Sequence, residues 1–144
     1  MKRLYIEFED IDAPSFFNYE RFNSWVDIIA EHYDRRVGKL SFIYCNDDKI
    51  LEVNKQFLDH DYYTDVITFD YCRRNIISGD IYISVDTVLS NSVQFSTSFE
   101  EEFNRVFCHA ILHLIGYKDK QDNDALEMRA QESKCLELLK LVGV

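Results

Sequence analysis

Hydrophobic and polar residues in the first half of the chain alternate between the two repeats typical of strands and helices. Residues 4–8 show the twofold repeat of a half-buried strand. Residues 18–36 repeat their apolar positions at steps of three and four, which predicts a helix ending before Gly38. A strand at residues 40–44 and a helix over residues 46–57, capped by its first residue, are predicted next.

The second half of the chain has the same two repeats after a polar and aromatic interruption. Residues 58–65 fit neither repeat and predict a loop. Strands are expected at residues 66–71 and 81–85, joined through a turn at 73–75 and paired antiparallel. Three helices follow: a short one capped by Asp86 and reaching Leu89, one over residues 99–115 with a Ser98–Glu101 capping box, and one over residues 124–141.

These elements predict a single α+β domain over residues 1–144, with a mixed four-stranded sheet packed with about five helices. A chain of 144 residues buries about two-thirds of its unfolded surface, which is enough for a stable core. The four cysteines are widely spaced and contain no C-x-x-C pair, so they are expected to be buried thiols.

The long helix carries a motif of possible metal ligands, H-x3-H-x2-G-x2-D. His109 and His113 are four residues apart, so a helix places them one turn apart on the same face. Gly116 can take the left-handed conformation that ends a helix, and the chain can then return Asp119 toward the same ion. The motif predicts a metal cleft at the end of this helix, holding one Zn²⁺ or another divalent transition metal.

Two imidazoles and one carboxylate leave a position for water, as in catalytic zinc sites. Zinc in such a site lowers the pKa of its bound water to about 7 and polarises the bond that is attacked. Hydrolysis of a peptide or of a phosphodiester fits these ligands, and for RNA the ribose 2′-hydroxyl is an alternative nucleophile. Peptidases of the H-E-x-x-H type need a glutamate where this chain has Ala110, so peptidase activity is disfavoured.

The chain is acidic, with 26 acidic and 16 basic residues and a formal net charge of −10. This balance argues against a surface that attracts nucleic acid everywhere, so any polyanion site must be local. No apolar window approaches the length of a membrane span, and we expect a soluble cytoplasmic protein. The short basic clusters, which are candidate phosphate contacts or ordinary solvated charges, are Arg35-Arg36 with Lys39, Arg73-Arg74, and Lys118 with Lys120.

A second group near the metal would be needed for proton transfer or phosphate binding, and the spacing singles out none. Candidates are His60 and Thr64 in the predicted loop, and Lys118 and Lys120 beside the motif. An exposed loop histidine is the alternative interpretation of His60, and His32 in the first helix is expected to be structural.

The motif resembles that of the YbeY family of bacterial metal-dependent endoribonucleases, His-Gly-x-Leu-His-Leu-x-Gly-Tyr-Asp-His. Residues 109–119 read His-Ala-Ile-Leu-His-Leu-Ile-Gly-Tyr-Lys-Asp. Residues 54–57 with 64–69, and residues 79–81, match further family segments in the same order. The resemblance extends from the second predicted strand to the last helix.

This resemblance implies a zinc-type site in the cleft of an α+β domain, with His109, His113 and Asp119 acting through the metal. It implies single-strand-specific RNA cleavage in 16S rRNA 3′-end maturation and ribosome quality control. The expected partners are therefore single-stranded or ribosomal RNA and the ribosome, with no DNA and no membrane.

Two departures from the family pattern affect the expected chemistry. The third ligand, commonly histidine in the family, is Asp119 here, which adds a negative charge and makes the metal a weaker Lewis acid. The family arginine thought to assist at the phosphate falls at Leu58, so another cation such as Arg73 or Arg74 would have to replace it. These departures keep a second hypothesis open, a non-catalytic ribosome assembly factor with a structural metal. A metallopeptidase is third.

Overall fold

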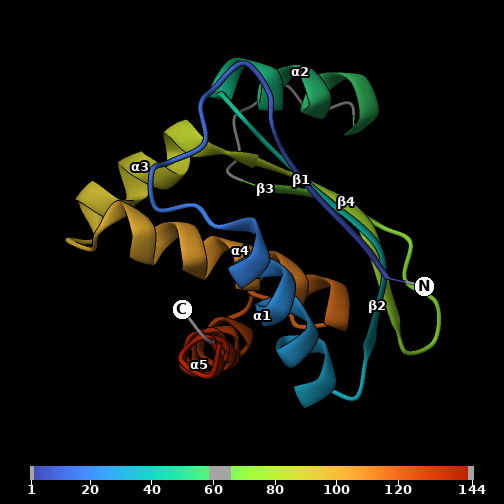
Figure 1. Ribbon diagram of the computed structural model, residues 1–144. Coiled ribbons are helices and arrows are strands. Elements are labelled where there is room, and N and C mark those ends of the chain that lie inside the picture. The colour runs from blue at the N-terminus through green and yellow to red at the C-terminus, as the bar shows by residue number, and fades with distance from the viewer. Residues whose placement is uncertain (1, 59–65, 143–144) are drawn as a thin grey trace.

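A mixed four-stranded sheet forms the centre of the protein (Figure 1). The structure is a computed structural model that describes residues 2–58 and 66–142. β1 pairs parallel with β2, β2 pairs parallel with β4, and β3 pairs antiparallel with β4. This arrangement confirms the predicted mixed sheet and the predicted antiparallel pair. In their order across the sheet the strands are β1 (Arg3–Phe8), β2 (Arg36–Cys45), β4 (Ile76–Ser84) and β3 (Val66–Asp70).

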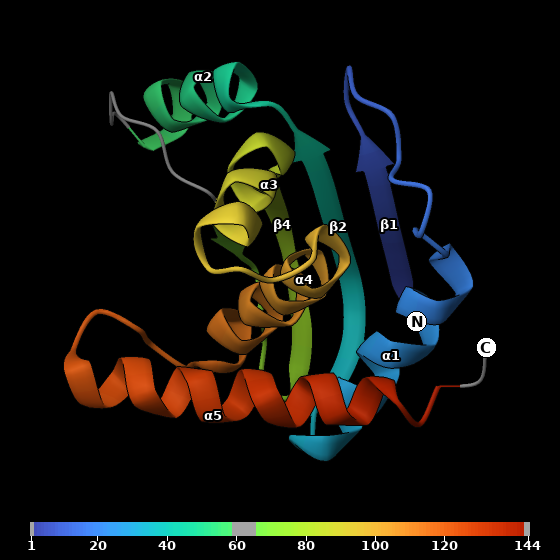
Figure 2. The same cartoon turned by 90° about the vertical axis from the view of Figure 1, so that its left-hand side faces the viewer.

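Helices cover both faces of the sheet, because both sets of alternating strand residues are largely apolar. Figure 1 shows α2 (Asp47–Leu58) on one face, and α1 (Tyr19–His32) and α4 (Phe99–Ile115) on the other. The short α3 (Val85–Gln94) leads from β4 into α4, and α5 (Asp122–Leu139) crosses the outer side of α4 and α1 (Figure 2). The α+β class and the five helices are thus as predicted.

The buried side of α4 is held against the sheet by aromatic packing. Phe107 stacks on Trp25 of α1 and on Phe42 of β2, with ring centroids 5.3 and 4.4 Å apart. Near the end of the helix, a Cβ on Gly79 would lie 2.6 Å from a backbone oxygen of β3 and 3.3 Å from Leu114. Gly79 therefore lets the last turn of α4 approach the sheet closely. This packing fixes the helix that carries the two histidines.

Several predicted boundaries were wrong. The strand expected at residues 81–85 is β4, which begins five residues earlier, at Ile76, and ends at Ser84. The short helix expected to reach Leu89 continues to Gln94. The first helix ends at His32 rather than near Arg36, because Asp34 adopts a left-handed backbone conformation with φ of 57° and turns the chain. β2 begins directly afterwards at Arg36. Ser84, not Asp86, caps α3: its side chain accepts a hydrogen bond from the backbone of Thr87.

The second helix begins as predicted, whereas the last helix is shifted along the chain. Asn46 caps α2 as expected, accepting a hydrogen bond from the backbone N–H of Lys49 at 2.8 Å. The last helix begins at Asp122 and ends at Leu139, two residues earlier at each end than predicted. The predicted loop at 58–65, apart from the last residue of α2, lies outside the described residues.

Two other expectations can be compared with the structure. The four cysteines are free, three of them buried and Cys72 half-buried. None of the helices in the described part of the chain combines the length and apolarity needed to cross a bilayer.

Candidate metal centre

Helix α4 positions His109 and His113 one turn apart at the margin of its buried side. The predicted capping box begins the helix: the Ser98 hydroxyl accepts from the Glu101 backbone, and the Glu101 carboxylate accepts from the Ser98 backbone. The helix ends at Gly116, whose φ of 123° few other residues adopt. Between these ends the two imidazole rings lie 4.5 Å apart, with side chains 16 and 30% exposed.

Asp119 returns to the histidines from the segment after Gly116. Its Oδ2 lies 3.3 Å from Nε2 of His109 and 3.4 Å from Nε2 of His113. The two Nε2 atoms are 3.0 Å apart. The structure thus brings one atom from each of the three residues proposed from the motif into a single cluster, within reach of one ion.

Hydrogen bonds on the far side of each ring identify which nitrogen carries a proton. Nδ1 of His113 lies 3.0 Å from the carbonyl oxygen of Tyr117, which can only accept, so Nδ1 donates. Nδ1 of His109 lies 2.5 Å from the carboxylate of Glu132, which accepts in the same way when ionised. When a ring carries a single proton, on Nδ1, its Nε2 bears a lone pair directed at the ligand cluster.

The cluster has the spacing of a tetrahedral zinc site. Bonds of about 2.0–2.1 Å to nitrogen or oxygen set tetrahedral ligand atoms about 3.3 Å apart. The observed separations are 3.0, 3.3 and 3.4 Å. Two nitrogen lone pairs and a carboxylate oxygen at these distances repel one another unless a proton or a metal cation lies between them. The three side chains therefore fit a divalent metal, with one position open for water or substrate.

Glu132 and Arg105 are residues of this site that the sequence prediction missed. Arg105 lies between two carboxylates, those of Glu102 and Glu132. Each of these glutamate side chains is only 3% exposed. Nη1 of Arg105 donates to Glu132 at 3.1 Å, and its other donors reach Glu102 at 2.7 and 2.8 Å. A signal was present, because Glu132 falls within the apolar stripe of α5 between Met128 and Cys135.

Charge partners keep the buried Glu132 ionised. Burial acts to raise the pKa of Glu132, but the hydrogen bond from His109 and the charge of Arg105 outweigh it, so the pKa lies below the ordinary value. For Arg105, burial acts to lower the pKa, and the hydrogen bond and charges of Glu102 and Glu132 raise it above the ordinary value. An ionised Glu132 supports the proton on Nδ1 of His109.

The other candidate residues lie at different distances from this cluster. Lys118 and Lys120 line an open pocket of about 480 Å³ together with His113 and Asp119. Arg73 and Arg74 lie in the turn between β3 and β4 and do not line that pocket, although neighbouring Cys72 contacts the carbonyl of Leu114 in α4 at 3.6 Å. His60 and Thr64 lie outside the described residues. His32 is exposed at the end of α1, and its ring contacts Tyr33.

Arg35 is a further cation near the end of α4. Its Nη2 donates to the carbonyl oxygen of Ile115 at 3.2 Å, and it lines a hollow of about 360 Å³ with Gly116 and Tyr117.

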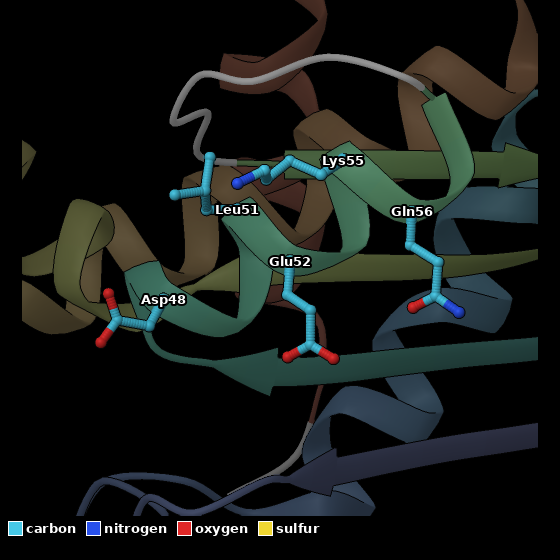
Figure 3. Close-up of a pocket in the computed structure, with 5 residues that line it drawn as sticks. All are labelled: Asp48, Leu51, Glu52, Lys55 and Gln56. Carbon is cyan, nitrogen blue, oxygen red and sulfur yellow. The ribbon is translucent and has the colours of Figure 1, made fainter.

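Another hollow, of about 470 Å³, lies against α2, on the opposite face of the sheet from α4 (Figure 3). Glu52 and Gln56 project from the same side of the helix in Figure 3. The residues that line it are Asp48, Leu51, Glu52, Lys55 and Gln56. They include no histidine or cysteine, so the chemistry concentrates at the end of α4.

Comparison with known proteins identifies similar chains. The family profile described as endoribonuclease YbeY matches residues 6–140. An endoribonuclease YbeY of Bacteroides fragilis is 51% identical over 132 residues, covering 92% of this chain and 94% of that protein. The endoribonuclease YbeY of Phocaeicola vulgatus is 52% identical over 133 residues, covering 92 and 96%.

A solved structure has a similar fold. The solution structure of TM1509 from Thermotoga maritima superposes with a TM-score of 0.70 at 29% sequence identity. The match covers 95% of this chain and 89% of the Thermotoga chain.

Proposed function

Because the chain belongs to the endoribonuclease YbeY family, we propose that it is a zinc-dependent endoribonuclease that cuts single-stranded RNA. His109, His113 and Asp119 hold the zinc, and residues 1–144 act as one domain. The observation that carries this proposal is the convergence of two lone-pair nitrogens and a carboxylate oxygen, 3.0–3.4 Å apart. Bound zinc would supply an activated water and offset charge on the phosphate.

The chain's own residues have separate tasks in this proposal. His109 and His113 present Nε2 to the ion, and the partners of their Nδ1 atoms keep each ring in one orientation. Asp119 adds a negative charge on the solvent side, where its side chain is 38% exposed. His113 and Asp119 line one pocket together with Lys118 and Lys120, whose ammonium groups we assign to phosphate binding.

Phosphates beyond the cleavage site need further cations. Arg73 and Arg74 in the β3–β4 turn are candidates, because the neighbouring Cys72 contacts the end of α4. Such contacts are local on a chain of net charge −10, so binding should weaken steeply with salt while long-range attraction stays small. His60 and Thr64 remain candidates for moving the proton of the attacking group, which is either water or the ribose 2′-hydroxyl.

The proposed natural substrate is ribosomal RNA, with cleavage serving 16S rRNA 3′-end maturation and ribosome quality control in the cytoplasm. What supports this is family membership, since the matched relatives are named endoribonucleases. The four free cysteines are compatible with that compartment.

One observation favours a second function, an assembly factor that binds the ribosome without cutting RNA. Leu58, the last residue of α2, occupies the position of the family arginine, so that cation is missing from this chain. The metal would then be structural. A peptidase is disfavoured, because Ala110 stands at the general-base position and is fully buried.

A cleavage assay distinguishes these functions. Purified protein is treated with a chelator and incubated with an end-labelled single-stranded RNA and a matched RNA duplex, before and after zinc is added back. The enzyme should cut the single strand only when zinc is restored and should leave the duplex intact. RNA binding without cutting at any zinc concentration would support the assembly factor. Casein digestion would instead indicate a peptidase.

A further inference from the structure

Glu132 is bound on one oxygen by two donors from α4. Its Oε2 lies 2.5 Å from Nδ1 of His109 and 3.1 Å from Nη1 of Arg105. Its Oε1 has no hydrogen-bond partner among the described residues, and Nη1 of the exposed Arg129 lies 3.6 Å from it. The carboxylate is therefore oriented by the groups on Oε2, and that oxygen faces the metal ligand.

Arg105 is itself held in place from the other side. Nε and Nη2 of Arg105 donate to the two oxygens of Glu102 at 2.8 and 2.7 Å, the paired geometry that orients a guanidinium most firmly. Glu102 thus fixes Arg105, and Arg105 fixes Glu132. The contacts therefore run in sequence from the buried Glu102 through Arg105 and Glu132 to the proposed ligand His109.

The charges in this chain of contacts do not cancel. Two buried carboxylates, Glu102 and Glu132, share one buried guanidinium. The guanidinium of Arg129, near Glu132, is exposed, so the buried groups carry one negative charge in excess. A buried excess charge is costly unless a positive group faces it. Since the imidazole of His109 separates Glu132 from the ligand cluster, a cation there would face this excess charge. A buried ion pair that only joined α4 to α5 would need no excess negative charge.

We propose that Glu132, held by Arg105, is a positioning residue for His109. It keeps the proton of His109 on Nδ1, so that Nε2 presents its lone pair to the metal, and its negative charge makes that nitrogen a stronger ligand. The inference rests on the proposed metal site and extends it to a carboxylate on a different helix.

Zinc affinity tests this role. Glu132→Gln keeps the side chain's shape and an oxygen that can accept from Nδ1, but removes the charge. Competition with a chelating dye should show zinc binding weakened about 10–100-fold, with one ion still bound at saturation. Glu137→Gln, the same change at an exposed position of α5, is the matched control and should bind zinc like the wild type. Equal affinity in both variants would overturn the proposal.

The tautomer of His109 gives a second test that needs neither zinc nor activity. Long-range nitrogen–proton spectra of the metal-free wild type should show the proton on Nδ1 of His109, and Glu132→Gln should reduce that preference. A proton on Nε2 in the wild type would refute the role of Glu132, even where Glu132→Gln fails to fold. Absence of zinc binding by the wild type would instead refute the metal site, so the two failures are distinguishable.

Discussion

The proposed metal site has two walls that are built differently. The helical wall comprises His109 and His113 on α4 with the buried pair Arg105 and Glu132 behind them. The loop wall comprises residues 116–120, all of which are exposed except the half-buried Tyr117. The helical wall is tied to the core by aromatic packing and buried charges. The loop wall is tied mainly by backbone hydrogen bonds from residues 116 and 117 to Leu112 at 3.1 and 3.0 Å.

This difference predicts where the site tolerates change. Each histidine of the helical wall donates a hydrogen bond from Nδ1 to a fixed acceptor, so a different ligand there would also require a different partner. The ligand in the loop wall, Asp119, projects from exposed chain, so another ligand type can replace it without repacking. The aspartate found where the family commonly has histidine lies in the loop wall.

The largest expected effect is the loss of a helical-wall ligand. His109→Ala and His113→Ala should each abolish stoichiometric zinc, because the remaining imidazole and Asp119 leave half of a tetrahedral shell to water. Elemental analysis of dialysed protein measures this. His32→Ala, the same change at an exposed histidine of α1, is the control and should retain one zinc. Zinc retained in both His109→Ala and His113→Ala would refute the proposed metal site.

The next effect concerns folding rather than binding. Arg105→Leu leaves Glu102 and Glu132 buried without their shared cation, so the free energy of unfolding should fall by about 3–5 kcal/mol. Denaturant unfolding of the metal-free protein measures it. Arg129→Leu removes an exposed guanidinium near the same carboxylate and should change stability by less than about 1 kcal/mol. Similar losses in the two variants would show that the helical wall is not held by buried charge.

Changing the loop-wall ligand should affect binding and spare the fold. Asp119→Ala should weaken zinc binding about 100-fold, since a structural zinc gains about 10–16 kcal/mol from four ligands. Asp119→His should keep one zinc and remove a negative charge, which makes the metal a stronger Lewis acid and favours cleavage. Zinc titration and RNA cleavage measure both variants. A folded but metal-free Asp119→His would show that the loop wall is as restrictive as the helical wall.

The smallest effect is expected at the turn that begins the loop wall. Gly116 has a φ of 123°, and a Cβ added there would meet no atom within 4 Å, so Gly116→Ala should cost only backbone strain of about 1–2 kcal/mol. Thermal unfolding and zinc titration measure it. An undiminished melting temperature would mean that the loop wall adjusts its backbone freely.

Local signals explain how much of this site could be predicted from sequence. The histidine spacing, the Ser98–Glu101 capping box and Gly116 all act within a few residues, so the helix and its end follow from the sequence. Glu132 lies 23 residues from His109, and its contact depends on how α5 packs on α4. The sequence indicated a role for Glu132 only through its position as a charged residue within the apolar stripe of α5.

In the fold, too, features set by nearby residues were predictable, whereas features set by contacts between distant segments were not. The sequence pattern predicted the presence of four strands, and the antiparallel pairing of β3 and β4 followed from the short turn between them. The parallel pairs β1–β2 and β2–β4 join strands that are far apart in the sequence, and no local pattern predicted them. The predicted end of α1 was wrong because Asp34, in a left-handed backbone conformation, turns the chain before the apolar pattern ends. Ser84 caps α3 because β4 ends there, and strand ends depend on pairing with neighbours.

The central claim is that one zinc ion, held by both walls, cuts RNA. Titrating zinc into metal-free protein while measuring both bound metal and single-stranded RNA cleavage tests it most directly. Cleavage should rise in proportion to bound zinc and reach its plateau at one ion per chain. Full cleavage by the metal-free protein, or one bound zinc with no cleavage, would contradict the claim.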